Sequence, residues 1–141
     1  MDENMLIHKL LDIFEYKNEY QLKTSNIQPQ DMYVLERLYR KGKMTSKDLS
    51  KEYGIPPSTL TGIIDRLESK KLIERSRASA DRRAVELLVT QEGKAVVERH
   101  IKEDMLFSKN LFNTLNKEKK EMLQELLQEL LQKVKKDTLF S

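Results

Sequence analysis

The sequence predicts a mainly α-helical protein that carries one small antiparallel β-hairpin. Apolar residues recur at helical spacing through most of the 141 residues. Two five-residue stretches, 73–77 and 85–89, instead alternate as strands do. Two short helical segments meet at a tight turn around Gly54, which is the spacing of a helix-turn-helix. A chain of this length is most simply one domain.

The composition favours a soluble protein without thiol chemistry. Charged residues make up 35% of the chain and hydrophobic residues 38%, and there is no cysteine. Disulfides and thiol nucleophiles are therefore excluded. The sequence has no run of about 18 apolar residues and no basic-then-apolar start typical of a signal peptide. We expect a cytoplasmic location by default.

Catalytic and metal-binding patterns are missing from the sequence. Four glycines form no phosphate-cradling loop, and no Ser-His-Asp spacing occurs. His8 and His100 are too far apart to form a helical metal pair. Glu103 and Asp104 lie within a turn of His100, so a weak metal site is the less favoured alternative to an ordinary helix residue. We expect no enzymatic activity, no cofactor and no metal.

The first two helices follow from apolar periodicity and from proline. A broad apolar stripe from Met5 to about Leu22 predicts the first helix, which must pack on its own core or on a second chain. Pro29 opens the second helix, with Gln28 at the cap position. That helix spans roughly residues 30–40, buries Leu35 and its apolar neighbours, and stops at Gly42.

Two short helices form the predicted helix-turn-helix. Thr45 caps the first of them, and Asp48 stands three positions later, as in a capping box. Gly54 supplies the left-handed conformation that ends many helices. Pro57 opens the second, since its fixed φ suits a first helical position. Its apolar face carries Leu60, Ile63, Ile64 and Leu67.

The other face of the Pro57 helix and the hairpin after it have the chemistry of a DNA-binding surface. The helix carries Ser58, Thr59, Thr61 and Arg66, whose hydrogen-bonding groups fit the base edges of a major groove. Residues 66–83 contain seven cations and three anions, and this excess of positive charge suits contact with phosphate or a narrow groove. Residues 32–100 hold fifteen basic and ten acidic residues, whereas the ends are near-neutral or acidic. An ordinary amphipathic helix with a solvated hairpin is the alternative.

The C-terminal third predicts two more helices. Thr90 caps a long one, whose expected buried face holds Val96, Val97, Ile101, Met105 and Leu106. Asn116 caps the last helix, in which leucine pairs recur from residue 122 to Val134. So regular a stripe favours an interface between two chains, although part of it can belong to an intramolecular core.

Residues from the first short helix to the start of the long C-terminal helix form one pattern, which consists of Thr45, Leu49, Gly54, Ser58, Thr59, Thr61, Asp65-Arg66-Leu67-Glu68, Leu72-Ile73, Arg75, Asp81-Arg82-Arg83, Thr90 and Gly93. This pattern resembles that of the MarR family of bacterial transcription regulators. The resemblance implies a mainly α fold with a small antiparallel β-wing: a winged helix-turn-helix on a helical dimerisation domain. In this interpretation residues 29–100 bind DNA, and residues 1–28 and 101–141 form the dimerisation region.

The resemblance also implies the function and most of the site. We expect a homodimeric regulator of double-stranded DNA, most simply a repressor on pseudo-palindromic operators. Arg83 corresponds to the wing-tip arginine and Asp81 to the acid that orients it. The DNA-binding residues are then Thr45, Ser58, Thr59, Thr61, Arg66, Arg75, Arg77, Arg82 and Arg83.

Two further groups of residues complete the expectation. The resemblance implies that a small aromatic or anionic effector can bind near Phe14, Tyr16, Tyr33, Tyr39 and Met105, although aromatic residues of helices are more often plain core. Dimerisation is assigned to Leu10, Leu123, Leu126, Leu127, Leu130, Leu131 and Val134.

Two positions depart from the family pattern. The resemblance implies that the Pro57 helix is the recognition helix, which enters the major groove. Lys71 replaces a glycine that is frequent after this helix in the family, and Gly62 replaces a larger, often basic residue. An architectural or protein-binding winged-helix protein without operator specificity is therefore the alternative function. The sequence names neither the operator nor the effector.

Overall fold

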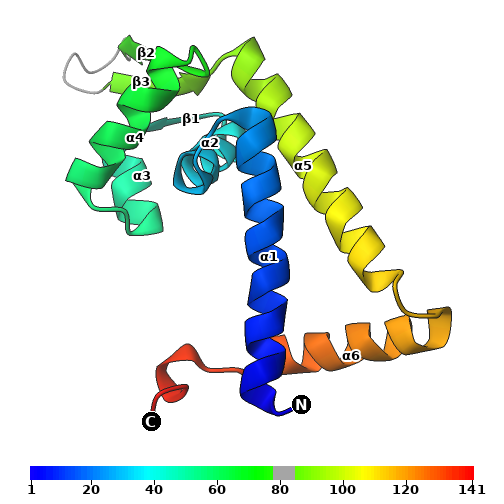
Figure 1. The fold of residues 1–141 in the computed structure, drawn as a ribbon. Coiled ribbons are helices and arrows are strands. Elements are labelled where there is room, and N and C mark those ends of the chain that lie inside the picture. The colour runs from blue at the N-terminus through cyan, green and yellow to red at the C-terminus, as the bar shows by residue number, and fades with distance from the viewer. Residues whose placement is uncertain (78–84) are drawn as a thin grey trace. The chain divides into compact units, whose positions relative to one another are not determined.

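The structure, a computed structural model, describes residues 1–77 and 85–141. These residues form two compact units, Met1–Lys102 and Glu103–Ser141, which are described separately. The first unit contains α1 (Glu3–Ser25), α2 (Pro29–Lys41), β1 (Lys43–Thr45), α3 (Ser46–Tyr53), α4 (Pro57–Ser69), β2 (Ile73–Arg77), β3 (Val85–Val89) and the start of α5 (Gln91–Phe112) (Figure 1). The second contains the end of α5, α6 (Lys117–Lys133) and the single 3-10 turn η1 (Lys136–Thr138).

The helix boundaries lie within a few residues of the predicted ones because local capping groups set them. Thr45 Oγ1 accepts a 3.1 Å hydrogen bond from the Asp48 amide at the start of α3. Asn116 Oδ1 accepts one of 2.9 Å from the Lys119 amide at the start of α6. Gly54 ends α3 in the left-handed region, with φ of 65°. Pro29 and Pro57 each occupy the first turn of their helix.

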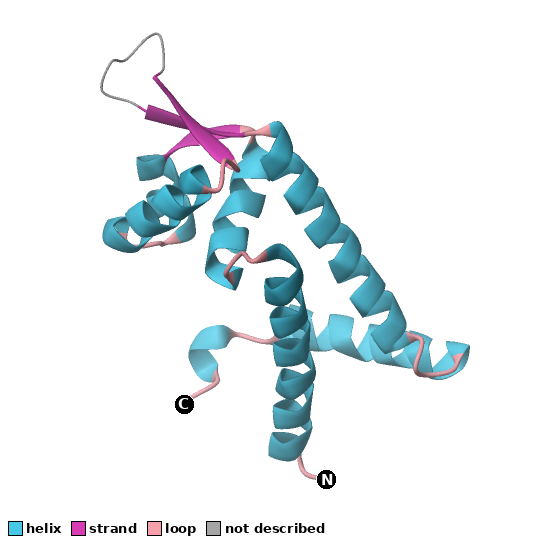
Figure 2. Cartoon of the chain, turned by 45° about the horizontal axis from the view of Figure 1, so that its top comes forward, coloured by secondary structure: helices cyan, strands magenta, loops and turns pink. Residues whose placement is uncertain are grey.

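The sheet has three strands, one more than the sequence predicted. The strand order is β1-β3-β2, and both pairs are antiparallel (Figure 2). In the predicted hairpin, Ile73 lies opposite Val89 and Arg75 opposite Leu87. The additional strand, β1, pairs Met44 with Leu87. Three residues are too few to show alternation, so β1 is defined only by its partner strand.

The core lies in the first unit, between α2, α3, α4, the sheet and the first turns of α5. All four apolar residues predicted for the inner face of α4 are buried. They pack with Leu35 and Leu38 of α2, Leu49 of α3 and Val97 of α5. The mainly helical winged fold is confirmed, and the recognition helix is held by its apolar face.

The predicted buried face of the long helix is correct only at its beginning. In α5, Val97 is buried and Val96 and Ile101 are partly buried against the core. Met105 and Leu106 are instead exposed, because the core of the first unit ends near Ile101. No residue of α6 is buried, and most apolar residues of α1 are exposed as well. None of the helices within the described ranges has the length and apolarity needed to cross a membrane.

Candidate nucleic-acid interface

The turn between α3 and α4 is fixed by hydrogen bonds across it. The Ile55 amide donates to the Ser50 carbonyl at 3.2 Å. The Ser50 hydroxyl donates to the Ile55 carbonyl at 2.6 Å. Pro56 precedes the helix and provides no side-chain cap, so the first amides of α4 have no capping side chain. The two hydrogen bonds between Ser50 and Ile55 therefore hold the start of α4 beside α3.

The outer face of α4 presents two of the predicted hydroxyls to solvent. Ser58 and Thr61 are exposed, whereas Thr59 is half-buried. Thr61 Oγ1 donates to the Pro57 carbonyl at 2.9 Å, which leaves its lone pairs free to accept. Thr45, also predicted for the site, uses its hydroxyl to cap α3.

The sequence analysis missed two lysines beside these hydroxyls. Lys47 and Lys51 of α3 line a groove of about 410 Å³ together with Pro57, Leu60 and Thr61 of α4. Their i, i+4 spacing on one face of a short helix is the signal that identifies them. The groove adds positive charge next to the start of α4.

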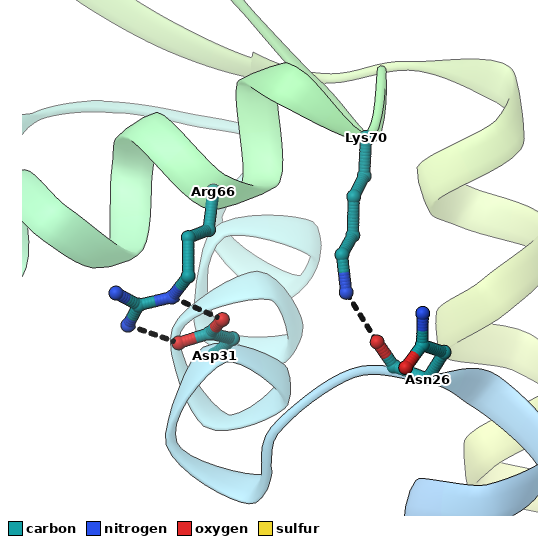
Figure 3. Close-up of polar contacts among 4 residues, drawn as sticks. All are labelled: Asn26, Asp31, Arg66 and Lys70. Carbon is teal, nitrogen blue, oxygen red and sulfur yellow. Dashed lines mark hydrogen bonds and ion pairs between the residues drawn. The ribbon is translucent and has the colours of Figure 1, made fainter.

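Arg66 makes the most specific polar contact of α4. Its Nε donates to Oδ2 of Asp31 at 2.9 Å, and its Nη2 donates to Oδ1 at 2.8 Å (Figure 3). Asp31 lies in the first turn of α2, where the helix dipole favours a negative charge, and is 1% exposed. The Arg66 side chain is still 51% exposed. Hydrogen bonding to Asp31, followed by its charge, raises the pKa of Arg66 above its usual value.

Lys70 connects the end of α4 to the end of α1. Its Nζ donates to the backbone carbonyl of Asn26, the residue that ends α1 in the left-handed region (Figure 3). Lys70 and Arg66 were counted among the seven cations of the predicted DNA-binding surface. Both instead have protein partners in the free chain, so the accessible charge is smaller than the sequence count.

Arg75 joins the wing to the recognition helix. Its Nη2 lies 2.7 Å from Asp65 Oδ1, and its Nη1 lies 3.5 Å from Glu68 Oε1. Both acids belong to α4, whereas Arg75 belongs to β2. Arg77, two residues along the same strand, is exposed. The remaining predicted wing residues, Asp81, Arg82 and Arg83, lie outside the described residues.

Lys71 lies between the end of α4 and the first strand of the wing, β2. Lys71 has a φ of 61°, a left-handed conformation that is rare for a residue with a Cβ. It completes a Schellman motif, in which the amides of Lys71 and Leu72 donate to the carbonyls of Glu68 and Leu67. Lys71 thus adopts the left-handed conformation that glycine usually provides at the end of a helix.

The residues predicted for an effector site have different surroundings in the structure. Tyr33 lines a cavity of about 200 Å³ between α1, α2 and α5, and Arg37 lies 3.9 Å above its ring centre. Phe14, Tyr16 and Met105 are exposed. Tyr39 donates to Glu98 at 3.2 Å, and this bond raises the pKa of the tyrosine. The cavity contains residues that the sequence analysis missed, among them Lys17, Arg37 and His100.

This arrangement of two short helices, a three-stranded wing and flanking long helices defines the winged helix-turn-helix class of proteins. Residues 27–85 match the model of the MarR family. The HTH-type transcriptional regulator YsmB of Bacillus subtilis (strain 168) is 30% identical over 106 residues, which cover 75% of this chain and 73% of YsmB. The chain belongs to the MarR family. Its named relatives are transcription regulators rather than enzymes.

Two further relatives from Bacillus subtilis (strain 168) match shorter regions. The HTH-type transcriptional regulator YwhA is 34% identical over 89 residues, which cover 63% of this chain and 64% of YwhA. The HTH-type transcriptional repressor MdtR is 32% identical over 72 residues, which cover 51% of this chain and 46% of MdtR. The matched region thus spans less than two thirds of each of these proteins.

Solved structures share the fold over nearly the whole chain. A mutant of MepR from S. aureus has a TM-score of 0.86 at 22% identity, covering 96% of this chain and 100% of that one. The S. aureus MepR–DNA complex has a TM-score of 0.74 at 24% identity, covering 94% and 96%. At these identities the likeness concerns the fold alone.

Proposed function

We propose that the chain is a homodimeric, sequence-specific DNA-binding regulator that represses transcription from pseudo-palindromic operators. The observation that carries the proposal is the outer face of α4, where Ser58 and Thr61 are exposed beside the lysines of α3. Hydroxyls of this kind read base edges, and the lysines suit flanking phosphates. A relative named as a repressor and a MepR structure solved with DNA support the same function.

The wing completes the proposed DNA contact. Arg77 is exposed on β2, and Arg82 and Arg83 follow it in the sequence. We assign Arg83 to a minor groove, with Asp81 as the carboxylate that orients it, because a held guanidinium loses less entropy on binding. Arg75 is assigned to the support of α4, since it is engaged by Asp65 and Glu68.

The dimer is supported by apolar side chains that the single chain leaves exposed. Leu126, Leu130 and Leu131 of α6 are each at least 60% exposed. Leu10 of α1 is exposed as well. Burial of large apolar side chains contributes about 1.5–3 kcal/mol each before the costs of association. In a two-fold dimer the two copies of α4 lie about 34 Å apart, one turn of DNA.

Effector control is assigned to the cavity that Tyr33, Arg37, Lys17 and His100 line. Its basic groups and the aromatic ring suit a small aromatic anion. Release from DNA then follows if the ligand binds the free protein more tightly than the DNA-bound one.

Selection of bound sequences from randomised duplex DNA, followed by fluorescence-anisotropy titration, tests this function. We expect a two-fold symmetric site that binds at least about 10³ times more tightly than random duplex. Equal affinity for both would reject sequence-specific regulation and favour the architectural alternative.

Sedimentation of Leu130→Asp tests the dimer separately. A charge on this stripe should produce monomers that retain the helical circular-dichroism spectrum. Gln128→Asp, at an exposed and neutral position of the same helix, adds the same single negative charge and serves as the control. A variant that sediments as the wild type would remove α6 from the interface.

A further inference from the structure

The guanidinium of Arg66 has two edges that can each donate a pair of hydrogen bonds, and among the residues that the structure describes only one of these edges has a partner. The Nε–Nη2 edge faces the carboxylate of Asp31 through two hydrogen bonds. The other edge consists of Nη1 and the second hydrogen of Nη2. Figure 3 shows Nη1 turned away from Asp31. Because a guanidinium carries five N–H donors in a rigid fork, this free edge is itself a bidentate donor.

The free edge lies across the exposed face of α4. Ser58, Gly62 and Arg66 are four residues apart in turn and therefore share one row of the helix. A Cβ built on Gly62 would lie 3.3 Å from Nη1 of Arg66. The guanidinium thus occupies the space that a side chain at residue 62 would take.

A glycine inside a helix needs a reason, because it costs roughly 1 kcal/mol relative to alanine. Gly62 has no positive φ that would require glycine. Its one close neighbour is the Arg66 guanidinium. Space for that group is the reason that the structure offers.

The location of Asp31 makes the arrangement rigid. Asp31 is 1% exposed and belongs to α2, whose Met32, Leu35 and Leu38 are part of the core. Its partner projects from α4 and remains half exposed. A buried, fixed carboxylate therefore holds an accessible cation in one orientation, and less side-chain entropy is lost when the free edge binds an acceptor pair.

We propose that Arg66 contacts DNA through its free Nη1–Nη2 edge, that Asp31 is its positioning residue, and that Gly62 provides the space for the contact. The inference rests on the proposed DNA-binding function. The free edge of Arg66 would bind a pair of hydrogen-bond acceptors on the duplex. O6 and N7 of a guanine and two oxygens of a phosphate both have this chemistry.

Three variants and a control test the assignment on the selected duplex and on random duplex. Arg66→Gln removes the charge and the fork, and should lower affinity for the selected site at least about tenfold. Asp31→Asn keeps Arg66 but loosens it. It should lower affinity for the selected site while affinity for random duplex stays equal or rises, since a negative charge is lost. Arg40→Gln, an exposed arginine paired with Glu36, should change neither value by more than about twofold.

Gly62→Leu provides a second test of the contact in case the Arg66→Gln variant does not fold. Leucine favours the helix and displaces the guanidinium without providing a donor. Affinity for the selected site should fall in a variant that keeps the helical circular-dichroism spectrum of the wild type.

The salt dependence separates the two sources of acceptors. Loss of a phosphate contact in Arg66→Gln should weaken binding to all sequences and reduce the slope of log K against log salt by about 0.9. Loss of a guanine contact should instead relax the preference at one base pair in each half-site. Both results support the inference.

Unchanged affinity for the selected site in folded Gly62→Leu or Arg66→Gln, with the wild type still specific, overturns the inference and leaves the proposed function intact. A wild type that shows no preference rejects the proposed function itself.

Discussion

The hydroxyl of Thr90 donates a 2.7 Å hydrogen bond to the backbone carbonyl of Lys71. The same oxygen accepts a 3.0 Å hydrogen bond from the amide of Gly93. One side chain therefore joins the end of the recognition helix, the exit of the wing and the start of α5. The position of the wing relative to α4 depends on this junction.

Replacement of Thr90 by valine tests the junction. Both hydrogen bonds are lost while the size of the side chain is kept, so we expect a loss of about 1–2 kcal/mol in the free energy of unfolding. Urea denaturation measures it. Thr90→Ser retains the hydroxyl and should recover most of the loss; equal destabilisation of both variants would contradict the role of the hydroxyl.

Replacement of Gly93 by alanine should be far more damaging. A Cβ at this position would lie 2.1 Å from the Leu72 carbonyl oxygen and 2.7 Å from Cγ1 of Val89. Backbone cannot move aside cheaply, so we expect a loss of at least about 3 kcal/mol, measured by thermal or urea denaturation.

The matched control for this prediction is Gly62→Ala, the same change inside a helix. Among the described residues its Cβ would meet only Nη1 of Arg66, at 3.3 Å, so a shift of a few tenths of an ångström at the end of that side chain makes room for it. Stability should stay the same or rise by up to about 1 kcal/mol. Similar losses in both variants would show that the approach of Gly93 to Leu72 is not the cause.

Replacement of Lys71 by glycine should stabilise the protein. The left-handed conformation costs a residue with a Cβ about 1–2 kcal/mol, and glycine adopts it freely. The greater entropy of glycine in the unfolded chain offsets part of this gain, so we expect a net increase of about 0.5–1 kcal/mol. Lys70→Gly, at a residue with negative φ, should instead destabilise. A destabilised Lys71→Gly would mean that the lysine side chain itself supports the fold.

A fourth prediction concerns pH and the ion pair between Lys41 and Glu52. The hydrogen bond that Lys41 donates to Glu52, followed by the negative charge of Glu52, raises the pKa of Lys41 above its usual value of 10.5. A raised pKa in the folded state means that the pair contributes stability below the usual value and loses it as pH rises through the raised one. The wild type should therefore melt slightly above Glu52→Gln at pH 8, and the difference should shrink as the pH rises above 10.5 and through the raised pKa of Lys41. A difference that persists at high pH would point to another cause. The effect should be small because both groups are exposed.

Helix capping and apolar periodicity explain why so much of the fold can be predicted from the sequence. The hydroxyl of Thr45 bonds an amide three residues away, and the apolar stripe of α4 repeats within two or three turns. Such signals are local, so neighbouring residues suffice to predict them. The recognition helix, the wing and the exposed leucines of α6 could all be predicted in this way.

The contacts of the site required the folded chain. Asp31 and Arg66 are 35 residues apart, and no periodicity indicates that an acid of α2 will receive an arginine of α4. The strand β1 likewise exists only because Met44 finds Leu87. Helix caps and amphipathic stripes were determined by the sequence alone, because their energies depend on groups within a few residues. Which arginines are held, and which of their donors remain free, was decided by packing between distant segments.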